Sequence, residues 1–168
     1  MPGTPENSAV LDLLDEAATD RLGRALAASL RIGDVVALDG ELGAGKTRLV
    51  RSVAEAAGVD EAQIGSPTFT LVREYATVTP DAPPVLFHLD AYRLHDADEY
   101  DALGPEEFTD RGAVLIEWAS RVAESLPADR LSVALTVTGE HARRAAITAG
   151  GPRSRALLDQ IAGGRSDG

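Results

Sequence analysis

The sequence predicts an α/β domain of three layers, with a mainly parallel sheet and an antiparallel hairpin at one edge. Short apolar runs bounded by turn residues recur along the chain, and helical patterns separate several of them. Alternation of strand and helix is typical of a parallel sheet that helices cover on both faces. Size is the third observation, because 168 residues with 44% hydrophobic content suit one core better than two full domains.

The apolar runs give the strands, and the periodic segments between them give the helices. Strands are predicted at residues 10–14, 35–38, 71–75, 85–89, 114–116 and 131–137. Helices are predicted at residues 19–30, 46–57, 97–103 and 119–126, and Pro127 ends the last one. Residues 131–137 and 145–148 are expected to pair as the edge hairpin. The proline-rich stretch 79–84 is expected to be a loop inside the domain.

Both ends of the chain are rich in glycine, proline and serine, which favours loose structure. We therefore expect residues 1–8 to be a flexible N-terminus, residues 9–150 to be the folded domain and residues 151–168 to be a flexible tail. A short helix at residues 154–161 is left open within that tail.

The charge balance of the chain is strongly acidic. Sixteen Lys and Arg residues against 27 Asp and Glu residues give a net charge of -11, and such a field repels phosphate backbones. Direct, unaided binding of nucleic acid is therefore disfavoured. The absence of cysteine excludes disulfides, thiol nucleophiles and iron-sulfur clusters. The sequence has neither an apolar run of membrane-spanning length nor the pattern of a secretion signal, so we expect a cytoplasmic protein with no membrane association.

One segment carries a chemical signature. Residues 40–47 read GELGAGKT, directly after a predicted strand and directly before a predicted helix. This pattern is the phosphate-binding loop, or P-loop, in which glycines let backbone N–H groups turn toward phosphate oxygens and the helix N-terminus adds partial positive charge. The fold is then P-loop NTPase-like. The residues expected to bind nucleotide are Gly40, Glu41, Leu42, Gly43, Ala44, Gly45, Lys46 and Thr47.

Lys46 is the only lysine of the chain, and it stands where a P-loop places the lysine that reaches the terminal phosphates. The hydroxyl of Thr47 is expected to hold Mg²⁺. The single lysine also indicates which nucleotide binds. The guanine-specific loops of the common GTPases need a lysine of their own, and the chain has none besides Lys46. ATP is therefore the expected nucleotide.

Two predicted strands end in acidic residues. Asp90 follows the strand at 85–89, and Glu117 follows the strand at 114–116. Ligands of open α/β sheets gather at the carboxyl ends of strands, so both carboxylates are expected to face the P-loop. One of them should join Thr47 as a Mg²⁺ ligand, since this cation prefers oxygen donors. The alternative is structural, with either carboxylate capping the turn or helix that follows it.

A third group of polar residues precedes the strand at 71–75. Ser66, Thr68 and Thr70 lie where P-loop proteins place a loop that senses the nucleotide, so their hydroxyls are candidates to approach the γ-phosphate or its attacking water. Threonines on the solvent face of a strand are the alternative. His88, Asp90 and Tyr92 would share a face if that strand continued to Tyr92, and a lone histidine is more often a hydrogen-bonding group than a catalyst.

Four segments of the chain resemble, in order and spacing, the TsaE family. They are GELGAGKT at 40–47, SPTFTLVREY at 66–75, HLDAYRL at 88–94 and LIEW at 115–118. The resemblance spans residues 9–150 and departs from the family at Ala119, where members often have proline. Members of this family are bacterial P-loop ATPases needed to make threonylcarbamoyladenosine in tRNA.

The resemblance implies a role for each site residue. Lys46, Asp90 and Glu117 are then catalytic, with Asp90 at the Walker-B-like position. Thr47 and Glu117 become the protein ligands of Mg²⁺. Glu16 lies in a segment that resembles the lining of the base pocket, which makes it a further nucleotide contact.

The same resemblance implies an accessory ATPase and not the enzyme that modifies the base. In the family, TsaD paired with TsaB transfers the threonylcarbamoyl group to adenosine 37 of tRNAs, and TsaE joins that pair and hydrolyses ATP. The tRNA would then be met indirectly, through the complex, which agrees with the acidic charge of the chain.

Two other functions would use the same loop. A small-molecule or nucleoside kinase needs an acceptor pocket and a closing lid, which only residues 97–110 could supply. A nucleotide-dependent assembly module would bind ATP without hydrolysing it. The fate of the γ-phosphate separates these functions from an ATPase.

Overall fold

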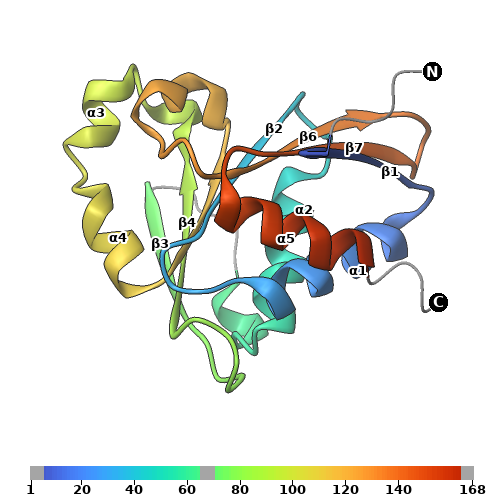
Figure 1. The fold of residues 1–168 in the computed structure, drawn as a ribbon, viewed down its shortest axis with the longest axis horizontal. Helices are drawn as coiled ribbons and strands as arrows, with labels where there is room; N and C mark the ends of the chain where they lie inside the picture. The colour runs from blue at the N-terminus through green and yellow to red at the C-terminus, as the bar shows by residue number, and fades with distance from the viewer. Residues whose placement is uncertain (1–5, 65–70, 164–168) are drawn as a thin grey trace.

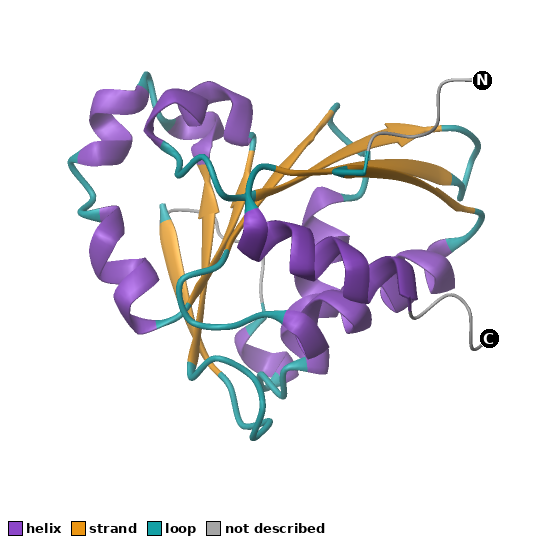
Figure 2. Ribbon diagram, in the orientation of Figure 1, coloured by secondary structure: helices purple, strands orange, loops and turns teal. Residues whose placement is uncertain are grey.

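The computed structural model describes residues 6–64 and 71–163, and it places helices on both faces of a seven-stranded sheet (Figures 1 and 2). The strands are β1 (Ser8–Leu13), β2 (Val35–Gly40), β3 (Val72–Ala76), β4 (Val85–Asp90), β5 (Ala113–Glu117), β6 (Leu131–Val137) and β7 (Arg143–Ala149). The α-helices are α1 (Glu16–Ser29), α2 (Lys46–Ala56), α3 (Ala97–Asp101), α4 (Pro105–Arg111) and α5 (Pro152–Gly163). Short 3₁₀ helices are η1 (Glu61–Gln63), η2 (Ala91–Arg93) and η3 (Ala119–Ser125). In these parts of the chain, every helix is too short or too polar to cross a membrane.

The order of the strands confirms the predicted fold class. Across the sheet the order is β1-β7-β6-β2-β5-β4-β3, and the four central strands β6, β2, β5 and β4 run parallel. β7 and β1 extend the sheet antiparallel on one side, and β3 does so on the other. The β6–β7 hairpin is present as predicted, but β1 pairs outside it and forms the edge itself. Leu11 and Leu13 of β1 are buried while Val10 and Asp12 are exposed, the alternation of a strand with one face in water.

The register of the sheet brings the ends of three strands together. Leu38 of β2 lies opposite Glu117 of β5, and Glu117 in turn lies opposite Asp90 of β4. Because parallel strands share one carboxyl edge, the loop that follows β2 opens beside both carboxylates. The fold therefore places the predicted P-loop and the two predicted acids at the same edge.

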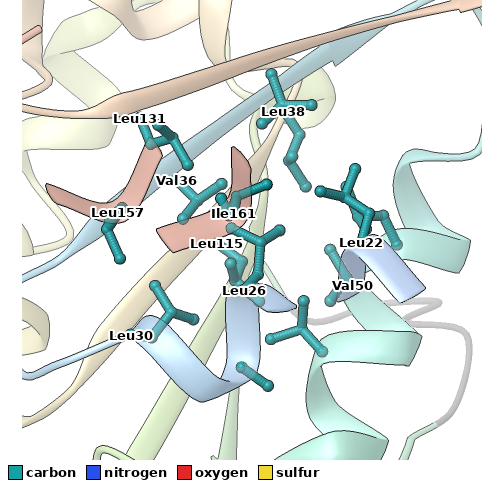
Figure 3. Close-up of a cluster of buried hydrophobic side chains, with 14 of the residues drawn as sticks. Leu22, Leu26, Leu30, Val36, Leu38, Val50, Leu115, Leu131, Leu157 and Ile161 are labelled. Carbon is teal, nitrogen blue, oxygen red and sulfur yellow. The ribbon is translucent and has the colours of Figure 1, made fainter. Parts of the chain in front are cut away.

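Alternate residues of the central strands fill two hydrophobic clusters, one on each face of the sheet. Val36, Leu38 and Leu115 lie in the cluster beneath α1, α2 and α5 (Figure 3). Phe87 and Ile116 belong to the cluster on the other face, beneath α3, α4 and η3. Burial on both faces explains why these strands read as continuous apolar runs in the sequence.

The segment expected to be a flexible tail is instead a packed helix, so that expectation is wrong for residues 152–163. The carboxylate of Asp129 accepts a hydrogen bond from the backbone N–H of Arg153 at 2.9 Å, which caps the start of α5. Leu157 of α5 is buried in the same cluster as α1. The guanidinium of Arg153 also pairs with the buried carboxylate of Asp34 at 2.8 Å. The helix that the sequence left open at 154–161 is therefore present, but its capping and packing partners lie far away in the sequence, so local composition did not show that it is anchored.

Two other helical segments differ from the prediction. The helix expected at 119–126 is the 3₁₀ helix η3, which is broken at Val122, where φ is -126°. The helix expected at 97–103 ends early, and a separate helix, α4, follows it. Gly104 has a left-handed conformation and Pro105 occupies the first helical position of α4. This glycine–proline pair starts a new helix and separates α4 from α3.

Candidate nucleotide-binding site

The loop between β2 and α2 is built on three glycines with positive φ. The angles are +151° at Gly40, +83° at Gly43 and +103° at Gly45, a range that residues with a side chain rarely adopt. At Gly40 a Cβ atom would also lie 2.6 Å from the carbonyl oxygen of Leu135 on β6. α2 begins directly after Gly45, which provides no side-chain cap. The first N–H groups of the helix are thus left to bind a ligand, as an anion site requires.

Lys46 reaches back into this loop. Its side chain is buried, and Nζ donates hydrogen bonds to the carbonyl oxygens of Gly40 and Glu41, the latter at 3.0 Å. Nζ also lies 4.1 Å from the ring centroid of Trp118. Burial lowers the pKa of Lys46, and the negative charge of Glu117 and two other carboxylates opposes that shift. The ammonium is therefore held by neutral acceptors that anionic phosphate oxygens can replace.

Glu117, at the end of β5, is the acidic centre of the site. Its side chain is buried, with Oε1 2.8 Å from Thr47 Oγ1 and Oε2 2.6 Å from His88 Nε2. Burial by itself would raise the pKa of Glu117, but the hydrogen bonds from His88 and Thr47 and the charge of Lys46 together hold it below its usual value. Glu117 is therefore ionised at neutral pH.

His88 orients this carboxylate. It lies on β4, the strand next to β5, and only 5% of its surface is exposed. Because an ionised carboxylate only accepts hydrogen bonds, Nε2 of His88 is the donor to Glu117. The sequence left His88 between a hydrogen-bonding role and a chemical one, and the geometry matches the former. β4 ends at Asp90, so Tyr92 lies in η2 and does not share the strand face of His88.

One carboxylate oxygen of Asp90 has the capping role that the sequence left open as an alternative. Its carboxylate oxygen Oδ1 accepts a hydrogen bond from the backbone N–H of Tyr92 at 3.0 Å and so caps η2. Its backbone lies opposite Glu117 in the sheet, and its charge acts on Lys46. Asp90 is therefore at the predicted edge, although it is Glu117 that contacts Thr47.

The remaining predicted site residues are Glu16 and three hydroxyl residues before β3. Glu16, at the start of α1, forms an ion pair with Arg48 in the first turn of α2 at 3.2 Å, and both side chains are largely exposed. This places Glu16 beside the helix that the P-loop begins. Ser66, Thr68 and Thr70 lie outside the described residues, so their predicted sensing role stays a prediction.

The sequence did not single out Arg143 at the start of β7. Its guanidinium donates hydrogen bonds to the carbonyl oxygens of Gly43 (Nη2, 3.1 Å) and Ala44 (Nε, 3.2 Å). The sheet pairing that brings β7 near the P-loop is a property of the fold, so no local signal marked this residue.

Trp118 closes the site beside Lys46. It is the one described residue other than glycine with a positive φ, +55°, a strained conformation of the kind that clusters at functional sites. Its ring centroid lies 5.2 Å from that of Tyr92. Arg121 donates a 2.7 Å hydrogen bond to the carbonyl oxygen of Tyr92, which helps to hold Tyr92 beside Trp118.

The donor set of the site fits Mg²⁺ bound together with phosphates. Among the described residues no group of three or more His, Asp or Glu side chains forms a complete metal site. Mg²⁺ commonly needs only one or two protein oxygens, because water and substrate phosphates supply the others. The hydroxyl of Thr47 and the carboxylate of Glu117, which lie in contact, are such a pair.

A glycine loop between strand and helix, a buried lysine inside it and a Thr–Glu oxygen pair at its rim define a P-loop nucleotide-binding protein. The model of one protein family, described as "Threonylcarbamoyl adenosine biosynthesis protein TsaE", matches residues 13–145. The chain belongs to the TsaE family.

Individual relatives agree with this membership. The chain is 37% identical over 144 residues to the tRNA threonylcarbamoyladenosine biosynthesis protein TsaE of Bacillus subtilis, which covers 85% of this chain and 87% of the relative. It is 41% identical over 137 residues to the protein of the same name from Streptomyces coelicolor, with 79% and 90% covered. The crystal structure of Bacillus subtilis YdiB matches with a TM-score of 0.75 at 30% identity, over 96% of this chain and 97% of that chain.

Proposed function

We propose that this protein is a Mg²⁺-dependent ATPase that supports the formation of threonylcarbamoyladenosine at adenosine 37 of tRNAs, as an accessory to the TsaD–TsaB pair. Membership of the TsaE family supports the pathway. The observation that carries the chemistry is the P-loop with Lys46 buried inside it and Thr47 in contact with Glu117.

Each residue of the site has a part in this reaction. Lys46 moves its hydrogen bonds from loop carbonyls to the β- and γ-phosphates, while the N–H groups of the loop and of α2 bind the remaining phosphate oxygens. Thr47 and Glu117 would hold Mg²⁺, which neutralises charge that develops on the phosphates. Asp90, fixed at the sheet edge by its bond to the Tyr92 N–H, is proposed to orient the attacking water with its second oxygen.

The proposed partners follow from the family and from charge. A protein with a net charge of -11 is poorly suited to approach tRNA alone, so contact through TsaD and TsaB is the consistent arrangement. A cytoplasmic location goes with a tRNA substrate. ATP hydrolysis in this proposal drives a conformational or release step of the complex.

The structure weakens the kinase alternative. That function needs a closing lid from residues 97–110, yet Tyr100 of α3 is only 2% exposed and Phe108 of α4 only 8% exposed. Both belong to the hydrophobic cluster beneath these helices, so the segment is packed against the sheet. If a kinase were present, radiolabel from the γ-phosphate of ATP would appear in a metabolite and not in free phosphate.

The test is reconstitution of tRNA modification from purified TsaD, TsaB and this protein. Modification over repeated turnovers should depend on this protein, and Lys46→Ala should fail to support it. Lys46→Ala that supports modification as well as the unaltered protein would contradict the proposal. Equal support from ATP and from a non-hydrolysable analogue would select the assembly module instead.

A further inference from the structure

Arg143 joins the P-loop to the turn between β6 and β7. Nε and Nη2 donate to the carbonyl oxygens of Ala44 and Gly43 at 3.2 and 3.1 Å. Nη1 donates to the carbonyl oxygens of Ala142 and Gly139 at 2.8 and 3.1 Å. One edge of the planar guanidinium thus holds two consecutive loop carbonyls, while the remaining nitrogen holds the hairpin turn.

These contacts fix the direction of the loop amides. In a planar trans peptide the C=O and N–H bonds point to opposite sides. Holding the Ala44 carbonyl therefore turns the N–H of Gly45 away from Arg143. The N–H of Ala44 closes the loop onto the carbonyl of Glu41 at 3.0 Å.

The loop carbonyls as a group are held by two cations. Lys46 donates hydrogen bonds to the carbonyl oxygens of Gly40 and Glu41, and Arg143 donates to those of Gly43 and Ala44. Carbonyl oxygens repel phosphate, so a loop whose Gly43 and Ala44 carbonyls are already held by Arg143 needs less rearrangement before it binds. Lys46 can transfer to the phosphate, whereas Arg143 is anchored at the turn as well and stays in place.

We propose that Arg143 is a positioning residue for triphosphate binding. It holds the Gly43–Ala44 part of the loop in the conformation that directs the Gly45 N–H away from Arg143 and toward the phosphate position, and it ties this conformation to the β6–β7 turn. The proposal rests on the proposed nucleotide-binding function and adds to it a residue that acts through the loop backbone.

The neighbouring Arg144 offers a matched control. It is the next residue of β7 and faces the other side of the sheet, where it pairs with Asp12 at 2.8 Å. Its side chain is 54% exposed. Replacing Arg144 removes the same charge from the same strand without touching the P-loop.

The experiment measures binding of Mg²⁺·ATP and of inorganic tripolyphosphate by calorimetry. Arg143→Ala should weaken both ligands by a similar factor of about ten or more, since hydrogen bonds from a charged group are lost. Arg143→Lys, which keeps the charge but cannot hold both carbonyls, should also weaken them, and Arg144→Ala should bind like the unaltered protein. In the free protein, Arg143→Ala should shift the amide resonances of Gly45 and Lys46, whereas Arg144→Ala should not.

Several results would overturn the proposal. One is tripolyphosphate binding by Arg143→Ala at the unaltered affinity. Another is a loss of affinity for ATP alone, which would mean that Arg143 acts on the adenosine part of the nucleotide and not on the phosphates. Amide shifts limited to the β6–β7 turn would mean that Arg143 stabilises the hairpin and does not position the P-loop. If Arg143→Ala does not fold, Arg143→Lys decides by the same measurements. Failure of the unaltered protein to bind either ligand would instead contradict the proposed function.

Discussion

Thr47 and Glu117 lie 70 positions apart in the chain, yet Thr47 Oγ1 and Glu117 Oε1 are 2.8 Å apart in the fold. This contact joins the first turn of α2 to the end of β5. His88 approaches the other oxygen of the same carboxylate at 2.6 Å, so the group is oriented from both sides. The pair forms the proposed Mg²⁺ end of the site, and Lys46 forms the phosphate end.

Replacing Glu117 by glutamine should raise the Mg²⁺ requirement of ATP hydrolysis. The amide keeps the shape of the side chain but loses its charge, so the Mg²⁺ concentration for half-maximal rate should rise at least about tenfold. Asp90→Asn is the control, because Asp90 caps η2 and does not contact Thr47. It should lower the rate with little change in the Mg²⁺ requirement. The same Mg²⁺ titration for Glu117→Gln and the unaltered protein would exclude Glu117 as a ligand.

Glu117 should also contribute to the loss of stability in acid. Its pKa in the folded protein is below the usual value of 4.5, because hydrogen bonds from His88 and Thr47 outweigh the effect of burial. Its ionised form therefore stabilises the fold fully above about pH 4.5, and this contribution is lost as pH falls through the lower, folded pKa. Melting temperatures measured between about pH 6 and pH 3 should fall less steeply for Glu117→Gln than for the unaltered protein. Identical slopes would show that the folded pKa is not lowered.

Trp118 should report nucleotide binding by fluorescence. It is the only tryptophan of the chain, and Lys46 Nζ lies 4.1 Å from its ring centroid. Movement of the ammonium to a phosphate changes the field at the ring, so emission should change when Mg²⁺·ATP is added and saturate with the binding curve. Lys46→Ala should show no such change at the same nucleotide concentration. An unchanged spectrum at saturating nucleotide would place the phosphates away from Trp118.

Arg153→Ala should destabilise the whole domain. Asp34, its partner, has a side chain only 3% exposed, and loss of Arg153 leaves that carboxylate buried without its cation. The expected loss in the free energy of unfolding is about 3 kcal/mol, measured by urea denaturation. Arg155→Ala is the control, since its ion pairs with Asp159 and Glu6 have exposed carboxylates and its hydrogen bond to Asn7 is exposed, so the loss should be about 1 kcal/mol or less. Equal effects of the two substitutions would mean that α5 is not anchored through Asp34.

Much of the site could be predicted because its signals are local. The glycines, Lys46 and Thr47 stand together in eight consecutive residues, and their strand–loop–helix context is visible in the pattern of apolar residues. Glu117 follows from the rule that ligands gather at strand ends, since an apolar run leads directly into it.

What the sequence did not reveal depends on contacts between distant segments. The sequence leaves open a helix at 154–161, but its packing is not visible there, because α5 is capped by Asp129 and anchored by Asp34, neither of which belongs to the helix. Arg143 acts on the P-loop only because β7 pairs beside β6, which lies next to β2 in the sheet. Asp39 is a further case, since its carboxylate accepts a hydrogen bond from the backbone N–H of Ser120 at 2.9 Å and only the folded sheet brings the two together.

Calorimetric titration of the folded protein with Mg²⁺·ATP tests the phosphate role of Lys46 most directly. We expect binding at one site, weakened about a hundredfold in Lys46→Ala because an ammonium–phosphate contact is lost. Lys46→Arg should weaken binding too, since the planar guanidinium does not fit where the buried ammonium lies. Absence of binding by the unaltered protein, or equal affinity in Lys46→Ala, would show that this loop does not bind triphosphate through Lys46.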